Sequence, residues 1–268
     1  MNAQIIALFV DTLKKELRNK TLYFALIFST ISIFIGYSIA KLFVQNGVAT
    51  NDMSSALGIN LMFKYLNVWG VIISVFFGVG AVRSDFHNNV IYQYLTFPIS
   101  RTTYFLTRLV GTWVMVFAFY LYSYIFTYIL FYSLYKNLTP TVGQVGNILV
   151  MGLYTFSYVS LTFIVSMYLN RLGSFLTMLF ISALITMSNN VFGLLSFADY
   201  LKDLGIFKII SFFIYYLLPR LTIMAEIGGS FLNGVKSEFN VPMEFYHYFL
   251  STAFVLWLGT YLIKKKDF

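Results

Sequence analysis

The chain has 268 residues, of which 59% are hydrophobic and only 10% are charged, and its mean hydropathy is +0.77. Soluble domains carry about 25% charged residues, so this composition excludes a soluble globular protein and predicts an all-α integral membrane protein. The absence of cysteine excludes disulfides and thiolate chemistry, and the formal charge of +8 is a topology signal here, not a sign of nucleic-acid binding.

The first predicted element is an amphipathic helix over residues 2–20, which we call the elbow. Apolar residues such as Ile5, Phe9 and Leu13 recur among charged ones. The charged positions near its end are Lys14, Lys15, Glu16 and Arg18. We expect the elbow to lie along the inner membrane surface. It serves either as a plain anchor or, in addition, as a contact for a cytoplasmic partner.

Six apolar stretches are long enough to cross a bilayer, which takes about 20 residues. They cover residues 21–41, 59–82, 106–132, 146–169, 172–197 and 246–263. The stretch 206–218 is short and contains Lys208, so we interpret it as a re-entrant or surface helix that Pro219 ends. It belongs to a long outer loop over 199–245. Residues 1–268 are therefore expected to form one transmembrane domain.

A charged segment over residues 83–101 separates the second and third spans. An apolar stripe with helical spacing is formed by Phe86, Val90, Tyr94 and Phe97. Pro98 should end this helix, Ser100 should cap the third span, and Arg101 should lie at the lipid boundary. Arg83 and Asp85 are expected to pair with each other or across an interface. The alternative is an ordinary loop that carries a positive-inside arginine.

Two spans carry small or polar residues at every fourth position. In the second span these are Gly70, Ser74 and Gly78; in the fifth they are Ser182, Thr186 and Asn190, with Asn189 alongside. The first set allows close helix approach, either within one subunit or at a dimer seam. The second set either lines a substrate path between subunits or forms hydrogen bonds between helices.

Charge sets the expected orientation. With both termini in the cytoplasm and six spans, nearly all of the net positive charge falls on the inner side. A seventh span would place the cluster Lys264, Lys265 and Lys266 outside, against the positive-inside tendency. We therefore expect a multi-pass protein of the plasma membrane, prokaryotic in type, with both termini inside.

These features together resemble the permease subunit of the ABC-2 class of ATP-binding-cassette transporters. The resemblance rests on the elbow ending Leu13-Lys14-Lys15-Glu16-Leu17-Arg18, on the order of spans and loops, and on Pro98-Ile99-Ser100-Arg101 at the start of the third span. Asp85 stands where the family usually has Glu, and Asn89 where it usually has Gly. The resemblance covers the whole chain in topology and is specific mainly over 83–101.

The resemblance implies a fold with an elbow, a cytoplasmic coupling helix between spans two and three, and outer re-entrant helices between spans five and six. It also implies two separate ATPase subunits that bind ATP and Mg²⁺, and a second permease chain, identical or similar. Residues 83–101 would dock in a groove of the ATPase and transmit its movement. Export is the usual direction of transport in this family. Spans rich in Phe, Tyr and Ile indicate a lipophilic or amphipathic cargo such as a peptide, lipid or drug.

The chain contains no G-x-x-x-x-G-K-[ST] phosphate loop, so it is not expected to hydrolyse ATP itself or to hold a cofactor. His87 and His247 lie far apart in a chain without cysteine, which argues against a metal site. An ion-coupled secondary transporter normally needs buried acidic residues, and here every acidic residue falls in a predicted loop or terminus. An intramembrane enzyme lacks a recognisable catalytic set, and a non-transporting scaffold or sensor stays open as an alternative.

Replacing Phe97 and Pro98, or reversing the charge of Asp85, is expected to uncouple ATP hydrolysis from transport while insertion and folding stay intact. The reason is that these side chains would transmit force without supporting the spans. Transport and ATPase rates measured on the same vesicles check this, and normal transport by the variants would remove the coupling role.

Overall fold

The structure is a computed structural model that describes residues 2–18, 20–45, 53–87, 99–134, 141–192 and 205–266. Within these ranges the chain is helical, with turns and no strand. The helices are α1 (Asn2–Leu17), α2 (Lys20–Gln45), α3 (Met53–His87), α5 (Arg101–Leu134), α6 (Val142–Ser166), α7 (Arg171–Phe192), α9 (Ile206–Leu217), α10 (Leu221–Asn233) and α11 (Val241–Lys265). The predicted all-α class is thereby confirmed.

Five helices are long and apolar enough to cross a membrane, namely α2, α3, α5, α6 and α7. The count becomes six if the bent pair α9–α10, with 55° between its two helices, is one span. The predicted sixth span, residues 246–263, does form a helix as part of α11, but α11 is not among the helices that length and apolar composition alone mark as spans. Length and composition therefore support five or six spans.

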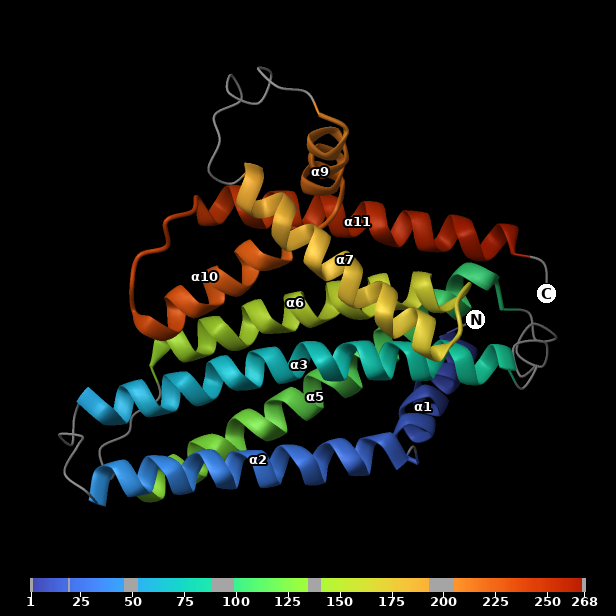
Figure 1. The fold of residues 1–268 in the computed structure, drawn as a ribbon. Helices are drawn as coiled ribbons and strands as arrows, with labels where there is room; N and C mark the ends of the chain where they lie inside the picture. The colour runs from blue at the N-terminus through green and yellow to red at the C-terminus, as the bar shows by residue number, and fades with distance from the viewer. Residues whose placement is uncertain are drawn as a thin grey trace.

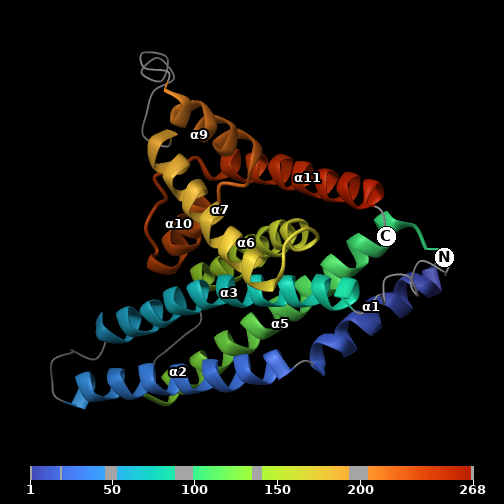
Figure 2. The ribbon, with the colours of Figure 1, turned by 45° about the vertical axis from the view of Figure 1, so that its right-hand side comes forward.

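The helices form an elongated bundle in which α3 and α6 are central. Both Figures 1 and 2 show the start of α1 and the end of α11 at the same end of the bundle. We call this the α1 end. In Figure 1 α9 stands nearly crosswise to α11, while α10 follows α6. α2 and α7 are the least buried of the five apolar helices and lie on the outside.

Two helices are longer than a bilayer requires, and this changes the predicted segment 83–101. α3 has 35 residues and α5 has 34, so each reaches about 50 Å. Residues 83–87, expected as part of a separate coupling element, continue α3 as helix, and Arg101 opens α5. The predicted coupling positions Val90, Tyr94, Phe97 and Pro98 lie outside the described residues. The side chain of Phe86 is not described either.

Two glycines of α6 allow α10 to pack closely against α6. A Cβ atom at Gly143 would lie 2.0 Å from the carbonyl oxygen of Phe231, and one at Gly146 would lie 3.2 Å from the ring of Phe231. From α3, the Asn60 amide donates to the carbonyl of Leu232 at 3.0 Å. α10 is therefore held tightly by α6 and α3, in agreement with the burial of Ile227, which is 0% exposed.

The neighbouring residues Gly228 and Gly229 provide a matched test of this packing. A Cβ atom at Gly228 would lie 2.9 Å from Asn147 Oδ1, whereas one at Gly229 meets nothing within 4 Å. Gly228→Ala should lower stability by about 1–3 kcal/mol because it overpacks a filled contact. Gly229→Ala should be neutral or raise stability by up to about 1 kcal/mol through helix propensity. Thermal unfolding of the purified chain checks both, and equal effects would contradict the packing.

Candidate functional site

Polar side chains from three helices meet near the α1 end of the bundle. Asp85 lies close to the end of α3, Tyr104 and Arg108 lie in the first turns of α5, and Thr12 and Lys15 lie on α1. Spacings of three and four residues place side chains on one face of a helix, so each helix presents its polar residues together. We call these five residues, with Asp11, the Asp85 joint.

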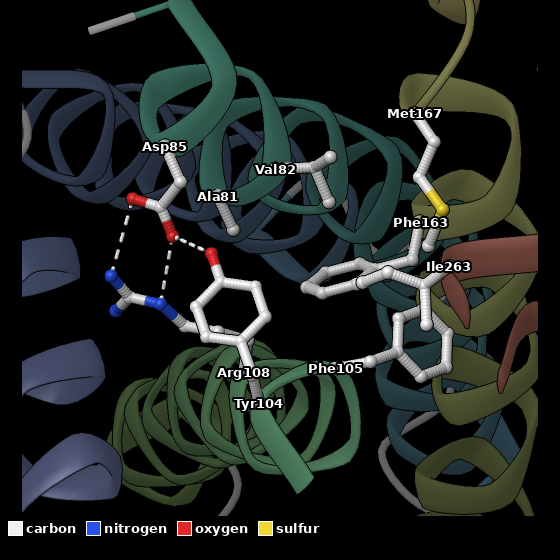
Figure 3. Close-up of a pocket in the computed structure, with 9 residues that line it drawn as sticks. All are labelled: Ala81, Val82, Asp85, Tyr104, Phe105, Arg108, Phe163, Met167 and Ile263. Carbon is white, nitrogen blue, oxygen red and sulfur yellow. Dashed lines mark hydrogen bonds and ion pairs between the residues drawn. The ribbon is translucent and has the colours of Figure 1, made fainter. Parts of the chain in front are cut away.

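The carboxylate of Asp85 is the centre of the joint. Arg108 Nε lies 2.8 Å from Asp85 Oδ2, and Arg108 Nη2 donates to Oδ1 at 3.2 Å. The hydroxyl of Tyr104 donates to Oδ2, and the ammonium group of Lys15 forms an ion pair with Oδ1. Figure 3 shows the carboxylate between the guanidinium of Arg108 and the hydroxyl of Tyr104.

Arg108 also binds α1. Its Nη1 donates to Thr12 Oγ1 at 2.9 Å and lies 3.4 Å from the carboxylate of Asp11. The helices touch closely here, since a Cβ atom at Gly111 would lie 2.8 Å from Thr12 Cγ2. One guanidinium group therefore connects α1, α3 and α5, and its planar fork of donors suits this bridging role.

The centre of the joint is buried, and the charges of the joint balance. Asp85 is 0% and Arg108 is 3% exposed. Two carboxylates, Asp85 and Asp11, face two cations, Arg108 and Lys15, so the formal charge sums to zero. Removing one partner of a buried ion pair typically costs about 3–5 kcal/mol, because the other charge stays buried without compensation. Loss of either buried charge, that of Asp85 or that of Arg108, is therefore expected to lower the stability of the protein strongly.

A narrow crevice adjoins the joint, but it does not accommodate a cargo. Besides Asp85, Tyr104 and Arg108, its lining is apolar and comes from Ala81, Val82, Phe105, Phe163, Met167 and Ile263. Its free space corresponds to about one water molecule. Among the described residues no group of three or more His, Asp or Glu side chains is placed to hold a metal ion. The site is suited to holding helices together, not to binding a small molecule.

The predicted partners of Asp85 require correction. The sequence placed Asp85 in a loop, paired with Arg83 or with an external partner, whereas the structure pairs it with Arg108 and Lys15 inside the chain. Reversing its charge is therefore expected to disturb folding, contrary to the sequence-based prediction. The physical reason is the length of α3, which continues past the apolar run and carries Asp85 into the bundle.

Arg101, another predicted residue of the segment 83–101, holds the end of α11. Arg101 Nη1 donates to the carbonyl oxygens of Lys266 at 2.7 Å and Lys264 at 3.2 Å. The ammonium group of Lys266 donates to the carbonyl of Met167. Burial, and secondarily the positive charge of Arg83, lower the pKa of Lys266. Arg83 thus faces the chain end, on a different side of α3 from Asp85.

The predicted cap of the third span is confirmed. The hydroxyl of Ser100 accepts the backbone N–H of Thr103 at 3.1 Å, which satisfies one of the open donors at the start of α5. The cap fixes where the chain enters α5 after residues 88–98.

The elbow is a packed helix with two different faces. Leu8, Thr12 and Glu16 are buried on the inner face, whereas Lys14 and Arg18 are exposed on the outer one. Lys15 lies between them and reaches Asp85. The inner face is thereby used by the chain itself, and only the outer face can meet lipid or a partner.

The stripe of small residues on α3 packs within the chain. A Cβ atom at Gly70 would lie 3.3 Å from the ring of Tyr120 on α5, and one at Gly78 would lie 2.9 Å from Thr162 on α6. Ser74 is buried and donates to the carbonyl of Gly70 at 2.6 Å. These contacts agree with the interpretation as packing within one subunit and leave no exposed surface at these positions for a dimer seam.

The polar residues on α7 point to different surroundings. Ser182 shares a hydrogen bond with the hydroxyl of Tyr158 at 2.9 Å, and Thr186 shares one with Thr222 at 3.2 Å. Asn189 is buried, and neither atom of its amide makes a hydrogen bond, whereas Asn190 is exposed. The first two residues therefore connect helices, and no common path unites all four.

Sequence reasoning missed four residues of the joint, Asp11, Thr12, Tyr104 and Arg108, and the last two of these bind Asp85 directly. A signal was present, because Arg108 falls inside the predicted span 106–132, and a charged residue inside a span usually faces a partner within the protein. The position of Tyr104, four residues earlier, would place it on the same face.

Comparisons with known proteins do not add a relative: no model of a known protein family matches the sequence, and no curated protein matches it.

The adjacent residues Lys14 and Lys15 test the joint. Lys15→Ala removes an ion pair to a buried carboxylate and should lower stability by about 1–2 kcal/mol, seen as a fall of several degrees in melting temperature. Lys14→Ala removes an exposed lysine from the same helix and should change stability by less than about 0.5 kcal/mol. Thermal unfolding of the purified chain measures both, and equal losses would argue against the ion pair.

Proposed function

We propose that the chain is the membrane permease subunit of an ATP-driven exporter of the ABC-2 class. Two ATPase subunits supplied by other chains bind its cytoplasmic side, and a second permease chain, identical or similar, completes the complex. The cargo is lipophilic or amphipathic. The spans are α2, α3, α5, α6, α7 and α11, in the plasma membrane of a prokaryotic cell, with both termini inside and α9–α10 on the outer side.

The distribution of charge supports this orientation. The α1 end gathers basic residues from several helices, among them Lys14, Arg18, Arg101, Arg108 and Lys266. Basic residues near the ends of spans favour the cytoplasmic side. Because α11 returns to the α1 end (Figures 1 and 2), both termini then share that side. The bent pair α9–α10 joins α11 near its start, so it belongs to the opposite half.

The observation that carries the proposal is the position of the Asp85 joint. The chain leaves α3 just after Asp85, passes through residues 88–98, and re-enters helix at the Ser100 cap. The joint clamps the end of α3, the start of α5 and α1 to one another within this short stretch. A force applied by an ATPase to residues 88–98 therefore acts on a rigid unit instead of fraying two separate helix ends.

The clamp extends to a further span through Arg101. Its hydrogen bonds to the carbonyls of Lys264 and Lys266 attach the end of α11 to the start of α5. Movement of the segment would thus be shared by α1, α3, α5 and α11. This is the arrangement that a permease needs if a small displacement at its cytoplasmic surface is to tilt several spans together.

One argument against ion-coupled transport has to be revised. The sequence assigned every acidic residue to a loop or terminus, but Asp85, Glu226 and Glu244 lie on helices. Asp85 and Glu244 are buried, and each is bonded to an arginine, Arg108 and Arg220 respectively. Carboxylates engaged in this way hold helices and are not open to a travelling proton or cation. We therefore keep the ATP-driven proposal.

Purification of the tagged chain in mild detergent, followed by mass spectrometry, tests the proposal. We expect an ATP-binding-cassette ATPase in about equimolar amount. Replacing Phe97 and Pro98 by alanine should reduce the ATPase recovered because these residues precede the clamped start of α5. Lys236→Ala, at an exposed position after α10 and so on the proposed outer side, serves as the control and should leave the recovery unchanged. A chain that runs alone, under conditions that preserve known transporter complexes, would contradict the proposal.

A further inference from the structure

A second buried ion pair lies at the break between α9 and α10, away from the Asp85 joint. Arg220 stands between the two helices, next to Pro219, and its Nη1 donates to both oxygens of Glu244 on α11, at 2.9 and 3.2 Å. Arg220 is 7% and Glu244 is 8% exposed. The guanidinium carbon also lies 3.8 Å from the centre of the ring of Tyr215, a cation–π contact.

α11 contributes a second polar contact to the same break. His247 lies three residues after Glu244 on α11. Its Nε2 donates to the carbonyl of Tyr216 at 3.1 Å. This carbonyl is one of those that the end of α9 leaves without a helical partner. Two side chains of α11 therefore fix the point at which α9 ends and α10 begins.

The two helices on either side of this point are held very differently. α10 is buried against α6 and α3, with Ile223, Met224 and Ile227 at most 2% exposed. Of the residues of α9, all of which are described, only Tyr215 is buried. Phe207 is 82% exposed. α9 is otherwise held by α7, where the hydroxyl of Ser188 donates to the carbonyl of Ser211 at 2.6 Å.

We propose that Arg220 and Glu244 form a latch, and that α9 swings about Pro219 as one piece when the latch opens, while α10 stays in place. The latch ties the end of α9 to α11 through Tyr215, the buried residue of α9, whose ring rests on the guanidinium group of Arg220. Opening the latch removes the support of Tyr215 at the end of α9. The contacts to α7 then hold α9, and α9 separates from α7 more often. The inference rests on this geometry alone and does not depend on the proposed transport function.

The absence of cysteine from the chain allows a sharp test by thiol labelling. Single reporters are placed in the full-length chain, Ser211→Cys on α9 and Met224→Cys on α10, and their reaction rates with a water-soluble maleimide are measured on purified protein. Glu244→Gln opens the latch with almost no change in volume. Glu226→Gln, the same chemical change at an exposed position of α10, is the matched control.

We expect Glu244→Gln to raise the labelling rate of Ser211→Cys by about tenfold or more, because loss of one partner of a buried ion pair strongly favours the open form. Met224→Cys should stay protected, and Glu226→Gln should change neither rate. An unchanged rate at Ser211→Cys would overturn the latch. A parallel rise at Met224→Cys would also overturn it, since the ion pair would then support the whole region instead of a movement of α9.

Discussion

The ion pair between Asp85 and Arg108 is the constraint on which the α1 end of the bundle depends. Both charges are withdrawn from water, so each must find its partner within the chain. The guanidinium group satisfies this need only if α3 and α5 keep their present separation and register. Its further bonds to Thr12 and Asp11 extend the requirement to α1. The elbow is thus positioned by electrostatics as well as by its apolar face.

Two kinds of polar contact join the helices. Charged pairs occur at Asp85 and at Arg220, and neutral hydrogen bonds occur elsewhere in the bundle. Asn67, Tyr120 and Asn147 form a closed set of such bonds between α3, α5 and α6, with distances of 2.7–3.2 Å. Neutral groups between helices cost less to bury than charges, so these bonds join the three helices without a further buried charge.

The two charged joints differ in what they connect. The Asp85 joint ties together helices that are also packed closely, as the approach of Gly111 to Thr12 shows. The latch of Arg220 and Glu244 ties the break between the exposed α9 and the buried α10 to α11. In our account the first transmits movement between spans, and the second restrains a movable element. The same kind of ion pair therefore makes the Asp85 joint rigid and restrains the movement of α9 at the latch.

Much of the fold could be predicted from the sequence, because hydropathy over about 20 residues is a local property. The apolar helices, the elbow and the Ser100 cap followed from short patterns.

The site could not be predicted in the same way. Asp85 seemed to follow the end of a span, since the apolar run stops at Val82, and nothing local showed that the helix continues to His87. Which residue pairs with Asp85 depends on how α1, α3 and α5 pack, and that is settled by contacts between residues far apart in sequence. The stripe with Gly70 and Gly78 was compatible with packing within the chain and with packing between chains, because the sequence does not show which residues lie opposite it.

A double-mutant cycle between Asp85 and Arg108 tests the central claim most directly. The stabilities of Asp85→Ala, Arg108→Ala and the double variant would be measured by thermal unfolding of the purified chain. Our account predicts that each single change costs about 3–5 kcal/mol and that the double variant loses less than the sum, with a coupling energy of about 1–3 kcal/mol. Losses that simply add would contradict it, because they would show that the two side chains act independently and that no joint unites α3 with α5.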